Sequence, residues 1–201
     1  MHYTPLNLPP SYPISAVYKN TAPSPTSPWV MPGNYIVKLS VNGVTFSQPL
    51  TIQMDPRVKT SKEELQKQHD FSMICYEGRK EITKISNETV SLHQQFENLR
   101  GSVNVELADS LIKLDKKITN IGNANSAGRI ENFNEVYNAL ASLFNSLQES
   151  DMAPTPQSVK DVKINQQFLK KLEDNWIKIK TVEVKDLNKK LKQAGQRPLE
   201  I

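Results

Sequence analysis

Few residues in this 201-residue sequence combine a reactive side chain with a spacing that could support chemistry. The three histidines, His2, His69 and His93, are far apart in the sequence, and a metal site needs three or four converging ligands. His69 and Asp70 are adjacent, so they point to different sides of a helix. Cys75 is the single cysteine and falls among helical apolar positions, which excludes an internal disulfide and predicts a buried, unreactive thiol.

Acidic residues occur in pairs, but in patterns typical of helix surfaces. General acid and base catalysis needs two carboxyl groups that face each other in unlike environments, and no spacing here places them so. The pairs are Glu63 and Glu64, Glu149 and Asp151, and Glu173 and Asp174. The sequence therefore predicts no catalytic, cofactor-binding or metal-binding residue, and it leaves open whether the protein is an enzyme.

Aromatic side chains are the remaining candidates for binding. Trp176 falls on an apolar helical seam and is predicted to lie in the core. Trp29 is either a packing anchor or an exposed platform that could stack on a sugar ring. Tyr12 and Tyr18 belong to the proline-rich segment before it. Trp29, Tyr12 and Tyr18 are therefore the candidate contacts for a glycan or a partner protein.

The charge of the chain is modest and evenly spread. Lys and Arg number 25 against 21 Asp and Glu, for a formal charge of +4, and both signs alternate along the helical segments. Clustered basic residues with interleaved aromatics are missing, so no nucleic-acid partner is predicted. No apolar run reaches the roughly 20 residues of a membrane span, and the first residues lack the charged and apolar regions of a signal peptide. We therefore expect neither a transmembrane segment nor a signal peptide.

Residues 1–58 predict a small β module. Eight of the 13 prolines fall within residues 1–33 and favour an extended segment that crosses a neighbouring surface. Asn42-Gly43 is the preferred pair for a two-residue hairpin turn, and it joins strands at 35–41 and 44–54. The register that follows places one set of apolar side chains on a single face: Tyr35, Val37, Leu39, Phe46 and Leu50. A two-stranded ribbon is not stable alone in water, so the proline-rich segment, the helices or a missing strand must cover this face.

From residue 59 onward the apolar period is that of helices. Four are predicted, at about 62–100, 104–122, 130–150 and 157–194, with the first and last longest. Gly78 falls on the apolar seam of the first and predicts a bend or a close helix crossing. Short polar loops favour an antiparallel four-helix up-and-down bundle. The expected class is α+β, with domains 1–58 and 59–201, and the seams also fit a homodimer that pairs helices between copies.

Two stretches of the sequence resemble a known family. The first is SPWVMPGNYIVKLSVNG at 27–43, which continues as QPLTIQMDPRV at 48–58. The second is LNKKL at 187–191, followed by Ala194-Gly195 and Pro198-Leu199. Both are similar to the C-terminal region of secreted bacterial BNR/Asp-box β-propeller proteins, labelled sialidase-like or glycosyl hydrolase. In that family a small immunoglobulin-like β module follows the propeller.

The resemblance implies a non-catalytic accessory region that packs against, orients or dimerises the upstream β-propeller of a secreted or periplasmic parent. Asp-box repeats do not occur in these 201 residues, so any catalytic residue of such a parent would lie outside them. The best match to the family pattern is 54–57, which is interpreted as structural, with Asp55 and Arg57 joining the β module to the first helix. The alternative is a stand-alone helical module for protein–protein interaction.

Overall fold

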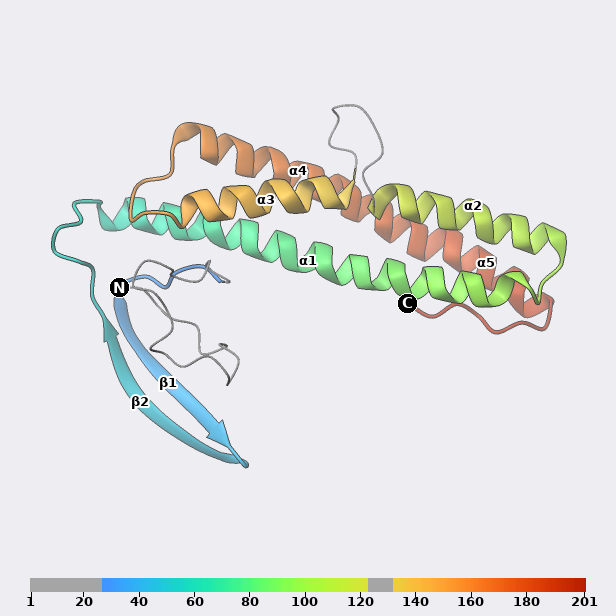
Figure 1. Ribbon diagram of the computed structural model, residues 1–201, viewed down its shortest axis with the longest axis horizontal. Coiled ribbons are helices and arrows are strands. Elements are labelled where there is room, and N and C mark those ends of the chain that lie inside the picture. Colours follow the sequence, from blue (N-terminus) through green and yellow to red (C-terminus); the bar gives the residue numbers. More distant parts are fainter. Residues whose placement is uncertain (1–26, 123–131) are drawn as a thin grey trace, which may run out of the picture.

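A single helix of 39 residues, α1 (Lys62–Arg100), runs the length of the molecule (Figure 1). The computed structural model describes residues 27–122 and 132–201, so most of the proline-rich segment lies outside the described residues. The other elements are β1 (Gly33–Val41), β2 (Val44–Ile52), α2 (Val105–Gly122), α3 (Phe133–Leu147), α4 (Pro156–Lys178), η2 (Ile179–Val184) and α5 (Lys185–Gln193). A two-stranded antiparallel sheet followed by a helical bundle confirms the predicted α+β class.

The start of α1 is encoded locally. Ser61 is its N-cap and accepts a hydrogen bond from the backbone N–H of Glu64 at 3.2 Å. The Glu64 carboxylate in turn accepts from the backbone N–H of Ser61 at 3.0 Å. This reciprocal pair satisfies two N–H groups that a helix start leaves without partners, so α1 begins at the residue the sequence predicts.

The four predicted helices occupy three positions across the bundle, because α2 and α3 lie end to end and run in the same direction (Figure 1). Arg79 of α1 donates to the hydroxyl of Tyr137 on α3, and His93 further along α1 pairs with Asp115 on α2. From Arg79 to His93 the residue numbers on α1 rise, whereas those of the partners fall from Tyr137 on α3 to Asp115 on α2. Both α2 and α3 are therefore antiparallel to α1. Strict up-and-down alternation does not occur, because helices of 18 and 15 residues each cover only part of a 39-residue seam.

The last helical stretch, α4 to α5, is continuous and parallel to α1. It matches the predicted helix at 157–194, except that its middle, η2, is π-helical. Trp176 near the end of α4 contacts Glu88 in the middle of α1, and Gln196 just beyond α5 reaches Ser102 just beyond α1. Both long helices, α1 and the stretch from α4 to α5, therefore pack against the tandem pair of shorter ones.

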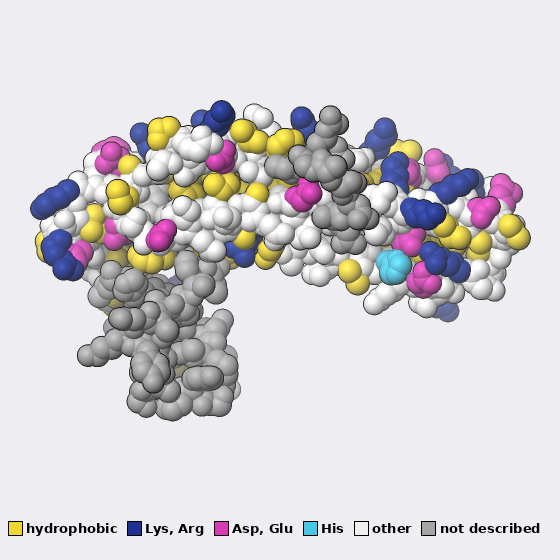
Figure 2. Space-filling model, turned by 45° about the horizontal axis from the view of Figure 1, so that its top comes forward, with side chains coloured by type: hydrophobic (Ala, Val, Ile, Leu, Met, Phe, Trp, Pro, Cys, Tyr) yellow, Lys and Arg dark blue, Asp and Glu magenta, His cyan; other side chains and the backbone are white. Residues whose placement is uncertain are grey.

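The apolar core extends along the whole rod. Its fully buried side chains include Cys75, Leu92, Phe96, Leu111, Val136, Leu140, Phe144, Val162, Trp176, Ile179 and Leu191. Burial raises the pKa of the Cys75 thiol to about 12, which agrees with the predicted unreactive cysteine. Basic and acidic side chains are interspersed over the surface that Figure 2 shows. Among the described residues, no helix is both long and apolar enough to span a membrane.

A partly buried polar contact joins the second half of α1 to the last helix. The Glu88 carboxylate accepts a hydrogen bond from Trp176 Nε1 at 2.9 Å and one from Lys180 Nζ at 2.8 Å. Burial alone raises the pKa of Glu88, but the hydrogen bonds from Lys180 and Trp176 outweigh it and hold the pKa below its ordinary value. Trp176 is therefore a core residue whose one polar atom is satisfied, as the sequence predicts.

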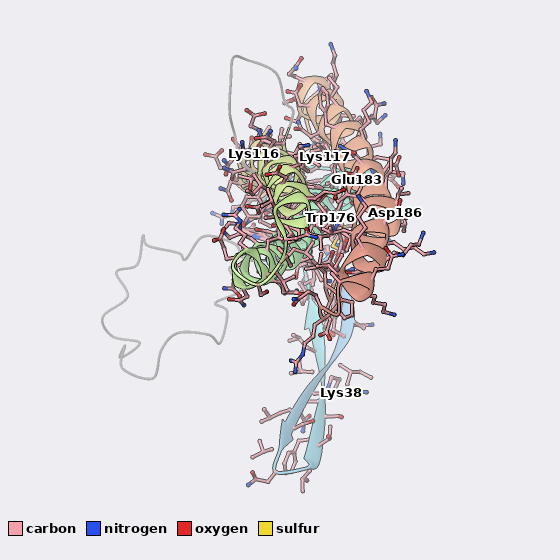
Figure 3. The ribbon with its side chains drawn as sticks, turned by 90° about the vertical axis from the view of Figure 1, so that its right-hand side faces the viewer. Lys38, Lys116, Lys117, Trp176, Glu183 and Asp186 are labelled. Atoms are coloured by element: carbon pink, nitrogen blue, oxygen red, sulfur yellow. The ribbon has the colours of Figure 1, made fainter. Side chains whose placement is uncertain are left out.

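The β-hairpin has the register expected from its turn. Asn42 and Gly43 have φ of 50° and 81°, as a type I′ turn requires, and pairing runs from Val41 with Val44 to Gly33 with Ile52. Figure 3, an end-on view of the rod, shows the ribbon leaving the bundle sideways with Lys38 on it. It also shows Lys117 of α2 and Glu183 of η2, which form an ion pair across the rod.

A side chain at Gly78 should force two packed leucine side chains to shift. A Cβ there would lie 2.8 Å from Leu140 Cδ1 and 3.1 Å from Leu169 Cδ2, which marks the predicted close helix crossing. Gly78→Ala should lower the free energy of unfolding by about 1 kcal/mol despite the better helix propensity of alanine. Urea unfolding measures this. Gly101→Ala is the matched control, because nothing lies within 4 Å of its Cβ position; an equal loss in both variants would contradict the crossing.

Glu88→Gln should weaken the fold in a pH-dependent way. The depressed pKa of Glu88 means that its ionised form stabilises the folded state above about pH 4.5, and that this stability is lost as the pH falls below that value. The variant should lose about 1 kcal/mol at pH 7 and show a flatter decline of stability in acid, measured by urea unfolding from pH 7 to 3. Exposed Glu77→Gln should behave like the wild type. Equal acid sensitivity of the Glu88 variant and the wild type would refute the role.

Candidate functional site

The most unusual surface of the described structure is one face of the β-hairpin, which we call the hairpin face. Six large apolar side chains on it are between 38% and 60% exposed: Val37, Leu39, Val41, Val44, Phe46 and Leu50. The helices do not cover them, so one of the three predicted sources of cover is excluded. The opposite face is polar near the turn, where the hydroxyls of Ser40 and Thr45 hydrogen-bond at 2.8 Å. A contiguous apolar surface of this kind is typical of a contact site in a soluble protein.

The two edges of the hairpin differ in what they offer a further strand. Because Val41 and Val44 flank a two-residue turn, they form a hydrogen-bonded pair, and alternate pairs from there outward leave their N–H and C=O groups at the edges. On β1 these outward groups belong to Asn34, Ile36, Lys38 and Ser40, all of which have an N–H. On β2, Pro49 interrupts the row. The edge of β1 is thus the better acceptor for an added strand.

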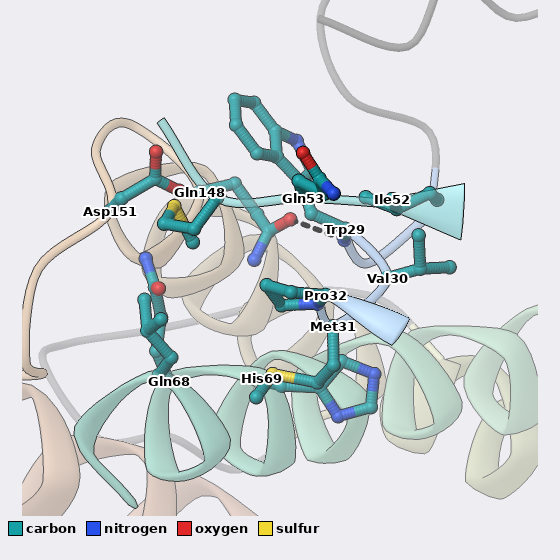
Figure 4. Close-up of a pocket in the computed structure, with 12 residues that line it drawn as sticks. Trp29, Val30, Met31, Pro32, Ile52, Gln53, Gln68, His69, Gln148 and Asp151 are labelled. Atoms are coloured by element: carbon teal, nitrogen blue, oxygen red, sulfur yellow. Dashed lines mark hydrogen bonds between the residues drawn. The ribbon is translucent and has the colours of Figure 1, made fainter. Parts of the chain in front are cut away.

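The base of the hairpin is tied to the rod through Trp29. Its backbone N–H donates to Gln148 Oε1 at 2.7 Å (Figure 4). The Gln148 amide in turn donates to Ser72 Oγ at 2.7 Å. The Ser72 hydroxyl donates a hydrogen bond to the carbonyl of Gln68 at 2.8 Å. Gln148 and Ser72 are buried, so this chain of bonds fixes the position at which the β module leaves the helices.

A shallow depression lies between the hairpin base and the rod. Trp29, Val30, Met31 and Pro32 line one side, and Gln68 and His69 of α1 line the other (Figure 4). The side-chain amide of Gln68 donates hydrogen bonds to the carbonyls of Leu147 and Ser150, so it satisfies backbone groups at the C-terminal end of α3. His69 and Asp151 are the ionisable residues of its lining, and the ion pair that His69 forms is with its neighbour Asp70. The arrangement is that of a packed junction.

The predicted contact residues meet different outcomes. Trp29 is half-buried at the hairpin base, so its role as a packing anchor is supported by its place in the junction. Tyr12 and Tyr18 lie outside the described residues. Asp55 and Arg57 pair with each other through Arg57 Nε at 3.0 Å and Nη2 at 2.6 Å. The predicted bridge from these residues to the first helix is therefore wrong, because the two side chains bond to each other and stabilise a local turn.

One cluster in the described part of the chain has the residue types of a metal site: His93, Glu97 and Asp115. His93 Nδ1 lies 2.8 Å from Asp115 Oδ1. Arg100, however, contacts Glu97 at 2.6 Å and Asp115 at 2.9 Å, and it supplies the positive charge that a cation would bring. The cluster is thus an ion-pair network that joins α1 to α2.

Sequence reasoning did not consider this cluster. The spacing of His93 and Glu97, four residues apart on a helix, is a signal that the sequence contains. Arg100 follows Glu97 by three residues on the same helix, so it too is near them in the sequence. Asp115 joins them only because α2 packs against the end of α1.

Comparisons of the chain with protein-family models, with curated proteins and with solved structures found no match. The resemblance to BNR-repeat proteins therefore rests on the quoted stretches of sequence alone.

Arg100→Met should convert the ion-pair network into a metal site. Without the guanidinium, His93, Glu97 and Asp115 keep ligand atoms within 4.8 Å of one another and have no cation between the carboxylates. We expect Zn²⁺ to raise the Tm of this variant and to leave that of the wild type unchanged, as measured by thermal unfolding with and without the metal. Arg100→Met with Asp115→Asn is the control and should not respond. Stabilisation of the wild type by Zn²⁺ would show that Arg100 does not exclude a cation.

Proposed function

We propose that this chain is a non-catalytic accessory region that holds a neighbouring β domain at one end of a rigid helical rod. In keeping with the quoted resemblance, that domain is the β-propeller of a secreted BNR-repeat, sialidase-like protein. The observation that carries the proposal is the exposed hairpin face, because a ribbon of two strands needs a partner to bury its apolar side chains.

The contrast between the two parts of the molecule supports this function. The core of the rod is closed along its whole length, from Leu65 near the start of α1 to Leu191 near the end of α5. The hairpin instead exposes the apolar groups of the hairpin face. A domain that docks on the hairpin would gain roughly 1.5–3 kcal/mol for each large side chain it buries fully.

The attachment of the hairpin suits a positioning role. The Trp29 to Gln148 contact holds its base against the rod through buried amides. At 1.5 Å per residue, α1 is about 58 Å long. A domain docked on the hairpin would consequently be held at a defined place relative to a long surface with mixed charge.

A pair of hairpin variants tests the proposal. Leu39 and Phe46 are direct partners on the hairpin face, and Lys38 and Ser47 are direct partners on the other face. Leu39→Thr with Phe46→Thr should weaken binding to the β-propeller domain that the proposal places before this chain about tenfold or more, whereas Lys38→Thr with Ser47→Thr should have little effect. Titration calorimetry with the separately purified propeller gives the Kd values.

The possible results separate the proposed function from its alternative. If the propeller does not bind, or if both variants bind equally well, docking through the hairpin face is wrong. A stable complex that forms only between helical surfaces would support the stand-alone interaction module. Hydrolysis of a glycoside by the purified chain would contradict the non-catalytic assignment.

A further inference from the structure

The residues after α5 turn back and run along the outside of α1 (Figure 1, red). The turn is made by Gly195, whose φ of 73° favours glycine. Two hydrogen bonds typical of a helix C-cap accompany it, from Gln196 N to Leu191 O at 2.9 Å and from Gly195 N to Lys192 O at 3.0 Å. Residues 196–201, which we call the tail, then lie between α5 and α1 without secondary structure of their own.

Two side-chain amides bind the backbone of the tail from opposite sides. Asn188 of α5 accepts from the N–H of Leu199 at 2.6 Å and donates to its carbonyl at 3.0 Å. Gln95 of α1 does the same for Glu200, with both distances 2.8 Å. Each amide therefore satisfies both backbone groups of one tail residue, as a neighbouring strand would do. We call the space between Gln95 and Asn188 the tail groove.

Only one side chain of this segment is buried. Leu199 is 5% exposed and belongs to the apolar core, whereas Arg197, Pro198 and Glu200 are exposed. At Leu199 and Glu200, recognition thus consists of main-chain hydrogen bonds and a single apolar anchor, and the Gln196 side chain adds one bond to the carbonyl of Ser102 at 2.9 Å. This combination is how proteins bind extended peptide ligands, with backbone contacts supplying affinity and a pocket supplying specificity.

We propose that the tail groove is a peptide-binding site that can accept the tail of a second copy of this chain, giving a reciprocally exchanged dimer. The four hydrogen bonds of the two amides involve only Leu199 and Glu200 of the tail, so they are the same whichever copy supplies it. The link to α5 is short and contains Pro198, which favours an extended Arg197 and hence an outstretched tail. In a closed two-fold dimer both grooves are filled, and no backbone group is left unsatisfied.

The chain's own tail competes with that of a second copy. A short link gives the internal tail an effective concentration in the millimolar range, so exchange in the wild type requires a concentrated sample or a blocked internal tail. Two complementary variants remove this competition. Leu199→Asp disables the tail and leaves the groove intact; Gln95→Ala with Asn188→Ala disables the groove and leaves the tail intact.

The experiment mixes the two full-length variants and measures mass by size exclusion with light scattering. Each variant alone should be a monomer, and the equimolar mixture should form a species of twice the chain mass. A synthetic peptide of residues 195–201 should bind Leu199→Asp and raise its Tm, and the same peptide with Leu199 replaced by Ser should not. Arg197→Ser in the tail donor is the matched control and should leave the mixed dimer unchanged.

Circular dichroism first checks that each variant is folded, and Leu199→Ser replaces Leu199→Asp if the latter is not. A mixture that stays monomeric at about 1 mM overturns the proposal. Binding of the free peptide without formation of the mixed dimer also overturns it, because the groove would then serve only as an intramolecular clasp. Dimerisation of either variant alone would place the interface elsewhere.

Discussion

The apolar seam of α1 is the constraint on which the rest of the structure depends. A seam of 39 residues must be shielded from water over about 58 Å, and neither α2 nor α3 is long enough to shield it alone. The two therefore lie in tandem along one side, and the continuous helix from α4 to α5 covers the other. The polar contacts between helices, such as Glu88 with Trp176 and His93 with Asp115, lie at positions that this alignment brings together.

The rod and the hairpin differ in how completely they bury their apolar side chains. Within the described residues, the rod buries most of its large apolar side chains in one continuous core, and even the chain after Gly195 returns to place Leu199 there. The hairpin leaves its largest apolar face exposed, and its ribbon diverges from the helices (Figure 1). Since burial of such groups is the main favourable term in folding and association, the hairpin face is where a partner has most to contribute.

Local features of the fold were predictable from the sequence. Asn42-Gly43 specifies its turn through the φ values that these residues tolerate, and the register of the whole hairpin follows from it. Ser61 and Glu64 specify the start of α1 by capping, and the seam spacing predicts the core positions of Cys75 and Trp176. Gly78 marks the close crossing because only a missing side chain suits such a contact. These predictions succeed because each depends on neighbours within a few residues or on one periodicity.

The sequence by itself determined the kinds of elements, their boundaries to within about three residues and the hairpin register. Only the tertiary structure decided that α2 and α3 run in the same direction, that Arg100 pairs with Asp115 beside His93, and that Asn188 and Gln95 hold the chain after α5. The reason is physical. An amphipathic pattern states which face of a helix is buried, but many alignments bury that face equally well, and the polar contacts that select among them join residues distant in sequence.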